Sequence, residues 1–211
     1  MRFGVDEAGK GPVLGSMFAA AVQADPADLP EDVGDSKNIQ PERRRELALT
    51  IHDIARVGVA EIPVEEIDDP ETDMNTLTVV AHARALERVA EDGEAAIVDA
   101  GDTNAVRFGT RLAERLDIEM DVRAEHKADE NHAIVGAASI VAKVARDAHV
   151  EALAAKFGPL GSGYPSDPAT REFLEAYVER YGELPPCART SWQTSRDILG
   201  AASQASLDAF E

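Results

Sequence analysis

Cysteine, lysine and long apolar runs are all scarce in this chain of 211 residues. The single cysteine, Cys187, excludes an internal disulfide framework and a cysteine-based zinc site. No apolar run approaches the roughly 20 residues that a membrane span needs, and the segment after Met1 lacks the apolar core of a secretory signal. We therefore expect a soluble, cytoplasmic protein.

Charge of one sign dominates the composition, because 40 Asp and Glu stand against 21 Lys and Arg, giving a net charge of −19. Such an excess normally argues against a nucleic-acid partner, which binds through Lys and Arg. Only five of the basic residues are lysine, however, and acid-rich, lysine-poor surfaces suit concentrated salt, where the Debye length is about 3 Å at 1 M. The charge then reflects a halophile's solvent rather than the partner. An acidic protein from a dilute cytoplasm is the alternative.

Short apolar strands alternate with helices along the chain, which is long enough for one good-sized domain. Strands are predicted at residues 3–7, 17–23, 56–62, 95–98 and 118–122. Helices are predicted at residues 41–49, from an N-cap at Thr76, at 104–116 and 131–157, after Asp167-Pro168, and past Trp192. This order predicts an α/β fold with a mixed sheet over residues 1–158, a helical C-terminal extension over 159–200 packed on it, and a mobile tail over 201–211.

Three groups of acidic residues stand where chemistry is expected. Asp6-Glu7 ends the first strand, Asp99 closes the most apolar strand, and Asp129 precedes the long helix. Carboxylates gathered at one end of a sheet favour a hard divalent cation such as Mg²⁺ or Mn²⁺. Any one of them is more often an ordinary cap or loop residue. Adjacent Asp6 and Glu7 point to opposite faces of a regular strand, so we expect the chain to leave strand geometry at Glu7 if both reach one ion.

A series of motifs then resembles one family in order along nearly the whole chain. They are residues 4–15 (GVDEAGKGPVLG), 35–37 (DSK), 74–77 (MNTL), 98–100 (VDA), 127–129 (KAD), 137–147 (AASIVAKVARD), 161–167 (GSGYPSD) and 189–192 (RTSW). The series resembles ribonuclease HII, the type 2 ribonuclease H, in its archaeal branch. The resemblance implies an RNase H-like fold with a mixed five-stranded sheet flanked by helices. It also implies cleavage of the RNA strand of RNA–DNA hybrids and of single ribonucleotides embedded in DNA.

The resemblance also assigns the site. Its four metal-binding catalytic carboxylates match Asp6, Glu7, Asp99 and Asp129, and the implied mechanism is two-metal hydrolysis with Mg²⁺ or Mn²⁺, leaving a 5′-phosphate and a 3′-hydroxyl. The ribose 2′-hydroxyl is read by a Gly-x-Gly turn, here Gly9-Lys10-Gly11, and by a tyrosine that matches Tyr164. The phosphate contacts expected from the basic and polar motif residues are Ser36, Lys37, Lys143, Arg146 and Arg189.

One position departs from the family pattern, because the turn carries Lys10 where ribonuclease HII has arginine. Lysine keeps the charge and loses the planar fork of the guanidinium. The sister family ribonuclease HIII carries lysine there, so a ribonuclease HIII-like specificity is the nearest alternative. Other rivals are a non-catalytic protein that binds hybrids and an adaptor tethered to a sliding clamp.

The C-terminal residues Gln204, Leu207 and Phe210 have the spacing of a sliding-clamp (PCNA) interaction peptide, with Glu211 where the final aromatic residue is usual. An exposed terminal phenylalanine favours a partner. The alternative is that Phe210 folds back on the body of the protein. No apolar stripe is left over for a dimer interface, so we expect a monomer.

Overall fold

The computed structural model describes the backbone of residues 1–35 and 39–208 and the side chains of residues 1–34 and 39–204. It divides into two compact units. The sheet unit comprises Met1–Lys10, Met17–Ile62 and Thr72–Arg146, and the helical unit comprises Gly11–Ser16, Pro63–Glu71 and Asp147–Glu211. The division falls inside the long helix, earlier than residue 158, and the domain limits expected above stay a prediction.

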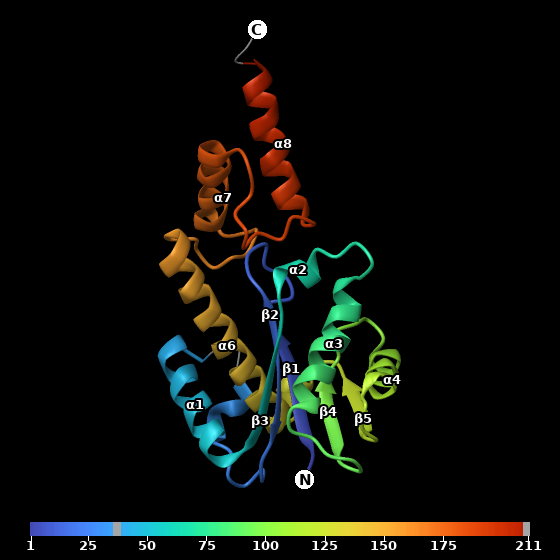
Figure 1. The fold of residues 1–211 in the computed structure, drawn as a ribbon. Helices are drawn as coiled ribbons and strands as arrows, with labels where there is room; N and C mark the ends of the chain where they lie inside the picture. Colours follow the sequence, from blue (N-terminus) through green and yellow to red (C-terminus); the bar gives the residue numbers. More distant parts are fainter. Residues whose placement is uncertain (36–38, 209–211) are drawn as a thin grey trace. The chain divides into compact units, whose positions relative to one another are not determined.

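The sheet unit is built on a five-stranded mixed sheet in the order β3-β2-β1-β4-β5 (Figure 1). Its strands are β1 (Phe3–Ala8), β2 (Met17–Gln23), β3 (Arg56–Ile62), β4 (Ala95–Asp99) and β5 (Asp121–Glu125). β2 runs antiparallel to β1 and β3, whereas β1, β4 and β5 are mutually parallel. The expected fold class is therefore confirmed. β5 begins at Asp121 rather than near residue 118, because the Glu119 amide and carbonyl are used by the loop before β4.

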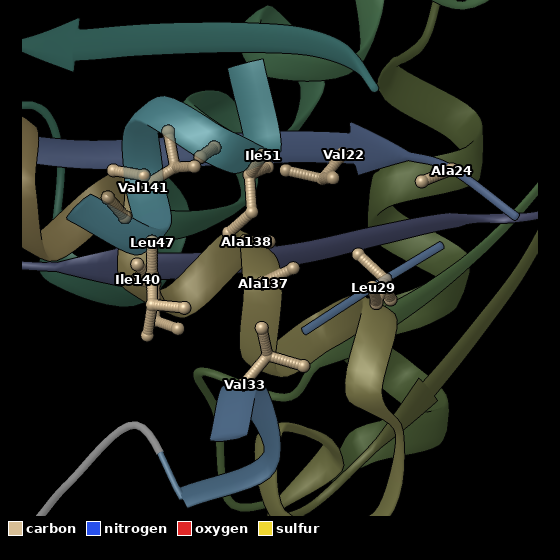
Figure 2. Close-up of a cluster of buried hydrophobic side chains, with 13 residues drawn as sticks. Val22, Ala24, Leu29, Val33, Leu47, Ile51, Ala137, Ala138, Ile140 and Val141 are labelled. Atoms are coloured by element: carbon tan, nitrogen blue, oxygen red, sulfur yellow. The ribbon is translucent and has the colours of Figure 1, made fainter. Parts of the chain in front are cut away.

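Helices cover both faces of this sheet (Figure 1). One face carries α1 (Pro41–Ile54) and the first half of α6 (Ala133–Phe157), and the other carries α3 (Met74–Glu87) and α4 (Ala105–Arg115). In Figure 2, Val22 of β2, Ile51 of α1 and Ala138 of α6 meet in one buried cluster. The glycine at position 4 of β1 allows a close approach to α6, because a Cβ there would lie 2.3 Å from the Ile134 backbone. The α6 face of β1 is thus packed directly against helix backbone.

The start of α3 differs from the prediction. The N-cap is Asp73, whose carboxylate accepts hydrogen bonds from the backbone N–H groups of Asn75 and Thr76 at 2.8 and 3.0 Å. An ionised carboxylate satisfies two amides and suits the positive end of the helix dipole, so it caps better than the Thr76 hydroxyl. The helix therefore begins one turn earlier than expected.

The helical unit consists of α2 (Val64–Ile67), the second half of α6, α7 (Pro168–Tyr181) and α8 (Gln193–Asp208). Its core includes Leu14, Leu174 and Ile198. The segment Gly11–Ser16 belongs here because the Val13 amide donates to the Gly163 carbonyl at 2.8 Å. α8 continues to Asp208, well into the segment for which a tail was expected. None of the helices in the described ranges has the length and apolar character needed to cross a membrane.

Asp68 fastens two loops of the helical unit together. Its carboxylate accepts hydrogen bonds from the backbone N–H and hydroxyl groups of both Thr190 and Ser191. Partial burial works to raise the pKa of Asp68, but these hydrogen bonds outweigh it and hold the pKa below its ordinary value. The ionised form is therefore the one that stabilises this junction.

We expect Asp68→Asn to lower the unfolding temperature at neutral pH, because one acceptor oxygen becomes a donor facing other donors. The cost is about 2 kcal/mol, or roughly 4–8 °C for a chain of this size. A depressed folded pKa gives stability that is present above the unfolded value near 3.9 and is lost as pH falls through the folded pKa. The unfolding temperatures of the wild type and of Asp68→Asn should therefore converge as the pH falls into the acid range, and thermal unfolding measures this. Asp69→Asn is the matched control, since its only described acceptor contact is to the Glu71 amide, and an equal loss there would contradict the prediction.

Candidate active site

The carboxyl ends of β1 and β4 place three acidic residues together. Val5 of β1 is in register with Val98 of β4, so Asp6 and Asp99 follow side by side on parallel strands. The expectation that the chain leaves strand geometry at Glu7 is wrong: β1 continues to Ala8, and Glu7 pairs with Ala19 of β2. Asp6 and Glu7 therefore point to opposite faces of the sheet. Glu7 nevertheless lies close enough to Asp6 and Asp99 for its charge to act on both carboxylates.

Asp6 lies on the α6 face and is only 6% exposed. Burial raises the pKa of its carboxyl well above the ordinary value, and the charges of Glu7 and Asp99 act in the same direction. Hydrogen bonds from the Ser139 hydroxyl of α6 and from the Glu7 amide, the latter at 2.8 Å, oppose the shift. Asp6 is thus a buried acid held among other acids.

Asp99 and Asp129 are brought together by a tight turn. The Ala128 amide donates to Asp99 Oδ1 at 2.7 Å, and Asp129 follows in the short helix α5 (Ala128–Asn131). Burial raises the pKa of Asp99, the Ala128 hydrogen bond opposes this, and the charges of Glu7 and Asp129 raise it further. Asp129 is itself buried, at 7% exposure. The acidic residues selected from the sequence thus interact with one another through Asp99.

Glu7 points to the α3 face, where it meets His82. The Nε2 atom of His82 lies 2.9 Å from Glu7 Oε2, and the imidazole ring is completely buried. The sequence analysis missed both His82 and Ser139. A single histidine within the apolar face of the helix over 74–87 is the signal that could have singled out His82, whereas nothing set Ser139 apart from other small residues of its helix.

The donor set consists of carboxylate oxygens, from Asp6, Glu7, Asp99 and Asp129. Oxygen donors are what Mg²⁺ and Mn²⁺ prefer, and a cation would offset the repulsion that raises the pKa values of Asp6 and Asp99. In the described part of the chain, no three acidic, histidine or cysteine side chains already enclose a point where an ion would sit. The residues therefore fit a divalent cation by chemistry, with some closing of the group required.

Lys127, in the turn before Asp129, has an energetically unfavourable backbone conformation. Its φ of 58° is left-handed, the only such angle at a non-glycine residue in the described ranges. This turn is what aims the Ala128 amide at Asp99. Backbone strain next to an active site is a common device for positioning.

We expect Lys127→Gly to raise the unfolding free energy by about 1 kcal/mol, or roughly 2–4 °C, because glycine adopts positive φ without penalty. Lys127→Ala is the control: it keeps the Cβ and removes only the exposed contact to Glu130 at 3.4 Å, which is worth little. Thermal unfolding in chelator measures both. A glycine variant no more stable than the alanine variant would show that the angle is not strained.

The Gly9-Lys10-Gly11 turn follows β1 directly, and Gly9 has a φ of 88°. The Lys10 ammonium donates to Asn75 Oδ1 at 3.1 Å and to the Gly101 carbonyl. Within the sheet unit, Lys10 therefore ties the turn to the start of α3 and to the loop after β4. The lysine thus supports the shape of the turn.

The helical unit gathers the other residues expected at the ribose. A Cβ at Gly11 would lie 3.6 Å from the ring of Tyr164, which is 41% exposed, so glycine leaves the space beside the tyrosine open. Trp192 Nε1 donates to the Gly11 carbonyl at 3.4 Å. Arg189 is fully buried, donates to the Gly15 carbonyl at 2.9 Å and stacks on Trp192. Its side chain thus holds the segment Gly11–Ser16 in place, and a phosphate contact for it stays a prediction.

The remaining predicted residues are less well defined. Lys143 and Arg146 lie on α6 in the sheet unit and are partly exposed. Gln204 is exposed on α8. Ser36, Lys37 and Phe210 lie outside the described residues, as does the side chain of Leu207. Their roles stay predictions.

Comparisons with known proteins identify the family. The family model for ribonuclease HII matches residues 3–195. The chain is 66% identical over 210 residues to ribonuclease HII of Halobacterium salinarum, covering 99% of each, and 65% identical over 211 residues to that of Haloarcula marismortui, covering 100% of each.

Solved structures give the same answer for the fold. The ribonuclease H2 of Pyrococcus horikoshii superposes with a TM-score of 0.89 at 39% identity, covering 96% of this chain and 98% of that one. The ribonuclease HII in a PCNA complex from Archaeoglobus fulgidus gives 0.84 at 39% identity, covering 94% and 96%. A Bst ribonuclease HIII with Mn²⁺ gives 0.81 at 21% identity, covering 96% and 71%, and shows the fold alone. The chain therefore belongs to the ribonuclease HII family of endonucleases.

Proposed function

We propose that this ribonuclease HII hydrolyses the RNA strand of RNA–DNA hybrids and nicks duplex DNA on the 5′ side of an embedded ribonucleotide. The products would carry a 5′-phosphate and a 3′-hydroxyl. The observation that carries the proposal is the gathering of Asp6, Glu7 and Asp99 at the ends of two parallel strands, with Asp129 of α5 close enough to act on Asp99. Its proposed place of action is the cytoplasm.

The carboxylates would hold two divalent ions, Mg²⁺ or Mn²⁺, and the Mn²⁺ complex of the related ribonuclease HIII supports this choice. Bound there, the ions supply activation of the attacking water and stabilisation of charge on the leaving 3′ oxygen. Asp6 and Asp99 would contribute most, since a bound cation would offset the repulsion between the charges of the site. Ser139 and the Ala128 amide hold these two carboxylates in orientation.

Selection for RNA would rest on the 2′-hydroxyl, the group that distinguishes ribose from deoxyribose. Gly9 and Gly11 allow backbone atoms of the turn to approach the sugar closely, and Tyr164 stands next to Gly11. Lys10 is engaged with Asn75 and Gly101, so we assign it to the shape of the turn rather than to a phosphate. Lys143, Arg146, Ser36, Lys37 and Arg189 are the proposed phosphate contacts.

One assay tests this function. A duplex with a single ribonucleotide and an all-RNA/DNA hybrid are incubated with Mg²⁺, Mn²⁺ or chelator in about 1 M KCl, chosen to screen the protein's own charge. We expect metal-dependent nicking on the 5′ side of the single ribonucleotide, abolished in Asp129→Asn. Binding without nicking would favour a non-catalytic hybrid-binding protein. Cleavage of the hybrid alone would favour ribonuclease HIII-like specificity.

A sliding clamp is the proposed protein partner. The Archaeoglobus fulgidus protein was solved as a PCNA:RNase HII complex, and residues Gln204, Leu207 and Phe210 have the matching spacing. The full chain and a Leu207→Ala/Phe210→Ala variant should be compared for binding to PCNA by calorimetry. We expect the double variant to lose binding and to keep nicking. If the clamp contact were the main role, the wild-type chain would bind PCNA and nick nothing.

A further inference from the structure

Among the residues that the structure describes, His82 is the one fully buried histidine in contact with a carboxylate of the site. It lies on α3, in the sheet unit, at 0% exposure, with Nε2 2.9 Å from Glu7 Oε2. The ring packs edge-on against Phe108 of α4, at 5.3 Å between ring centroids. Burying a polar ring among apolar groups is costly unless its polar atoms are used. The contact to Glu7 therefore offsets part of the cost of burying the His82 ring.

The second ring nitrogen fixes the direction of this hydrogen bond. His82 Nδ1 is buried and has no hydrogen-bond partner in the described part of the chain. A proton on Nδ1 would leave a buried N–H without an acceptor and would set the Nε2 lone pair against the carboxylate. A proton on Nε2 leaves only an unused lone pair at Nδ1, which is the more tolerated defect. The ring thus donates from Nε2 to Glu7.

The other oxygen of Glu7 lies in a confined place as well. A Cβ added at Gly101 would lie 3.2 Å from Glu7 Oε1 and 2.6 Å from Thr78 Cγ2. Gly101 follows Asp99 by two residues, so Oε1 lies next to the loop that leaves β4. Glu7 is therefore held at Oε2 by the imidazole and faces the Asp99 loop with Oε1.

We propose that His82 is a positioning residue, which fixes Oε2 of Glu7 from behind so that Oε1 is presented to the divalent ions. This inference rests on the proposed function, in which Glu7 is a metal ligand. A glutamate has three rotatable bonds, and Glu7 is repelled by the neighbouring acids. Without the imidazole, the Glu7 carboxylate can turn away from the site. The free-energy cost of ordering it again would then weaken metal binding. Outer hydrogen bonds of this kind are worth about 10- to 100-fold in metal affinity.

The test compares His82→Leu with His82→Gln. The glutamine amide can place an N–H near the position of Nε2, whereas leucine fills the space and donates nothing. Mn²⁺ affinity is measured without substrate from the electron paramagnetic resonance signal of the free ion, and nicking of a single-ribonucleotide duplex gives kcat and KM. We expect His82→Leu to bind Mn²⁺ about 10-fold or more weakly with KM for the duplex unchanged, and His82→Gln to recover most of the affinity.

Phe108→Leu is the matched control, because it loosens the same buried cluster and leaves the Glu7 contact in place. It should melt at a lower temperature and bind Mn²⁺ like the wild type. Equal Mn²⁺ affinity in His82→Leu and wild type would overturn the proposal, as would equal weakening in all three variants. In ¹⁵N-labelled wild type, imidazole resonances should place the proton on Nε2, and a proton on Nδ1 would also overturn it. A wild type that neither binds Mn²⁺ nor nicks would instead overturn the proposed function itself.

Discussion

Replacing Asp6 by asparagine is expected to make the protein more stable and almost inactive. Asp6 is buried, and burial together with the charges of Glu7 and Asp99 raises its pKa, so the ionised form destabilises the metal-free fold. An amide of the same shape removes this cost. We expect a gain of about 1 kcal/mol, or roughly 2–4 °C in chelator, with nicking reduced roughly 10³-fold. A substitution that raises stability and lowers activity is typical of a residue that is retained for function rather than for stability.

The stability gain should depend on pH in a defined direction. Because the folded pKa of Asp6 lies above the unfolded value near 3.9, its favourable contribution is present below the unfolded pKa and is lost as pH rises through the folded pKa. The difference between wild type and Asp6→Asn should therefore be full above the folded pKa of Asp6. It should shrink as the pH is lowered toward 3.9. Thermal unfolding in chelator across this range measures it.

Asp102 provides the matched control, since it is a second buried aspartate with the same exposure of 6%. The Arg107 guanidinium, 2.6 Å away, lowers the pKa of Asp102 to about 2. Asp102→Asn should therefore destabilise the protein at neutral pH, and this loss should fade only in strong acid. If Asp6→Asn proved destabilising too, the carboxylates would not be repelling one another as the structure indicates.

Removing salt is expected to produce the largest change in stability. With a net charge of −19, the folded chain repels itself, and the Debye length grows from about 3 Å at 1 M to about 30 Å at 0.01 M. We expect the unfolding temperature to fall by roughly 10 °C or more over this range, corresponding to about 3 kcal/mol or more. Nicking should fall with it, because the fold that gathers the carboxylates is lost. Circular dichroism during heating at stepped KCl concentrations measures the effect.

Two controls identify the cause. Screening by counterions should be complete near 1 M, whereas a salt effect on apolar burial keeps growing with concentration. Sucrose, which is excluded from protein surfaces and carries no charge, should not replace KCl. A protein equally stable at low salt would mean that its acidic residues are spaced widely enough to tolerate one another, and the halophilic interpretation would be wrong.

The sheet was predictable because its strands differ clearly from the segments around them. β2 and β3 match their predicted limits, since each is an apolar or alternating run between clear turn signals. β5 does not, because Ile118 is apolar enough to continue the strand by pattern, while the neighbouring Glu119 is held by the loop before β4. Hydrogen bonds to distant loops of this kind leave no local pattern.

The site was predictable only in its carboxylates. Asp6, Glu7, Asp99 and Asp129 stand at strand ends and helix starts that a sequence pattern can locate. His82 and Ser139 touch these carboxylates from helices distant in the sequence, and only the packing of α3 and α6 on opposite faces brings them there. The break in strand geometry considered at Glu7 does not occur, because β1 continues to Ala8. The strand pattern shows that Asp6 and Glu7 point to opposite faces of the sheet. It does not show which side chain each of them contacts on its face.

The alternation of β1 has a consequence for the integrity of the enzyme. Asp6 is matched to Ser139 on one face and Glu7 to His82 on the other. A shift of β1 by a single position against its neighbours would exchange the two faces, turning Phe3 and Val5 toward the backbone of α6 and taking each acid away from its own partner. Gly4 has room only for a hydrogen there. The two different faces of β1 therefore fix its register in the sheet. A chain paired in the wrong register would fail to pack and would not form an active site.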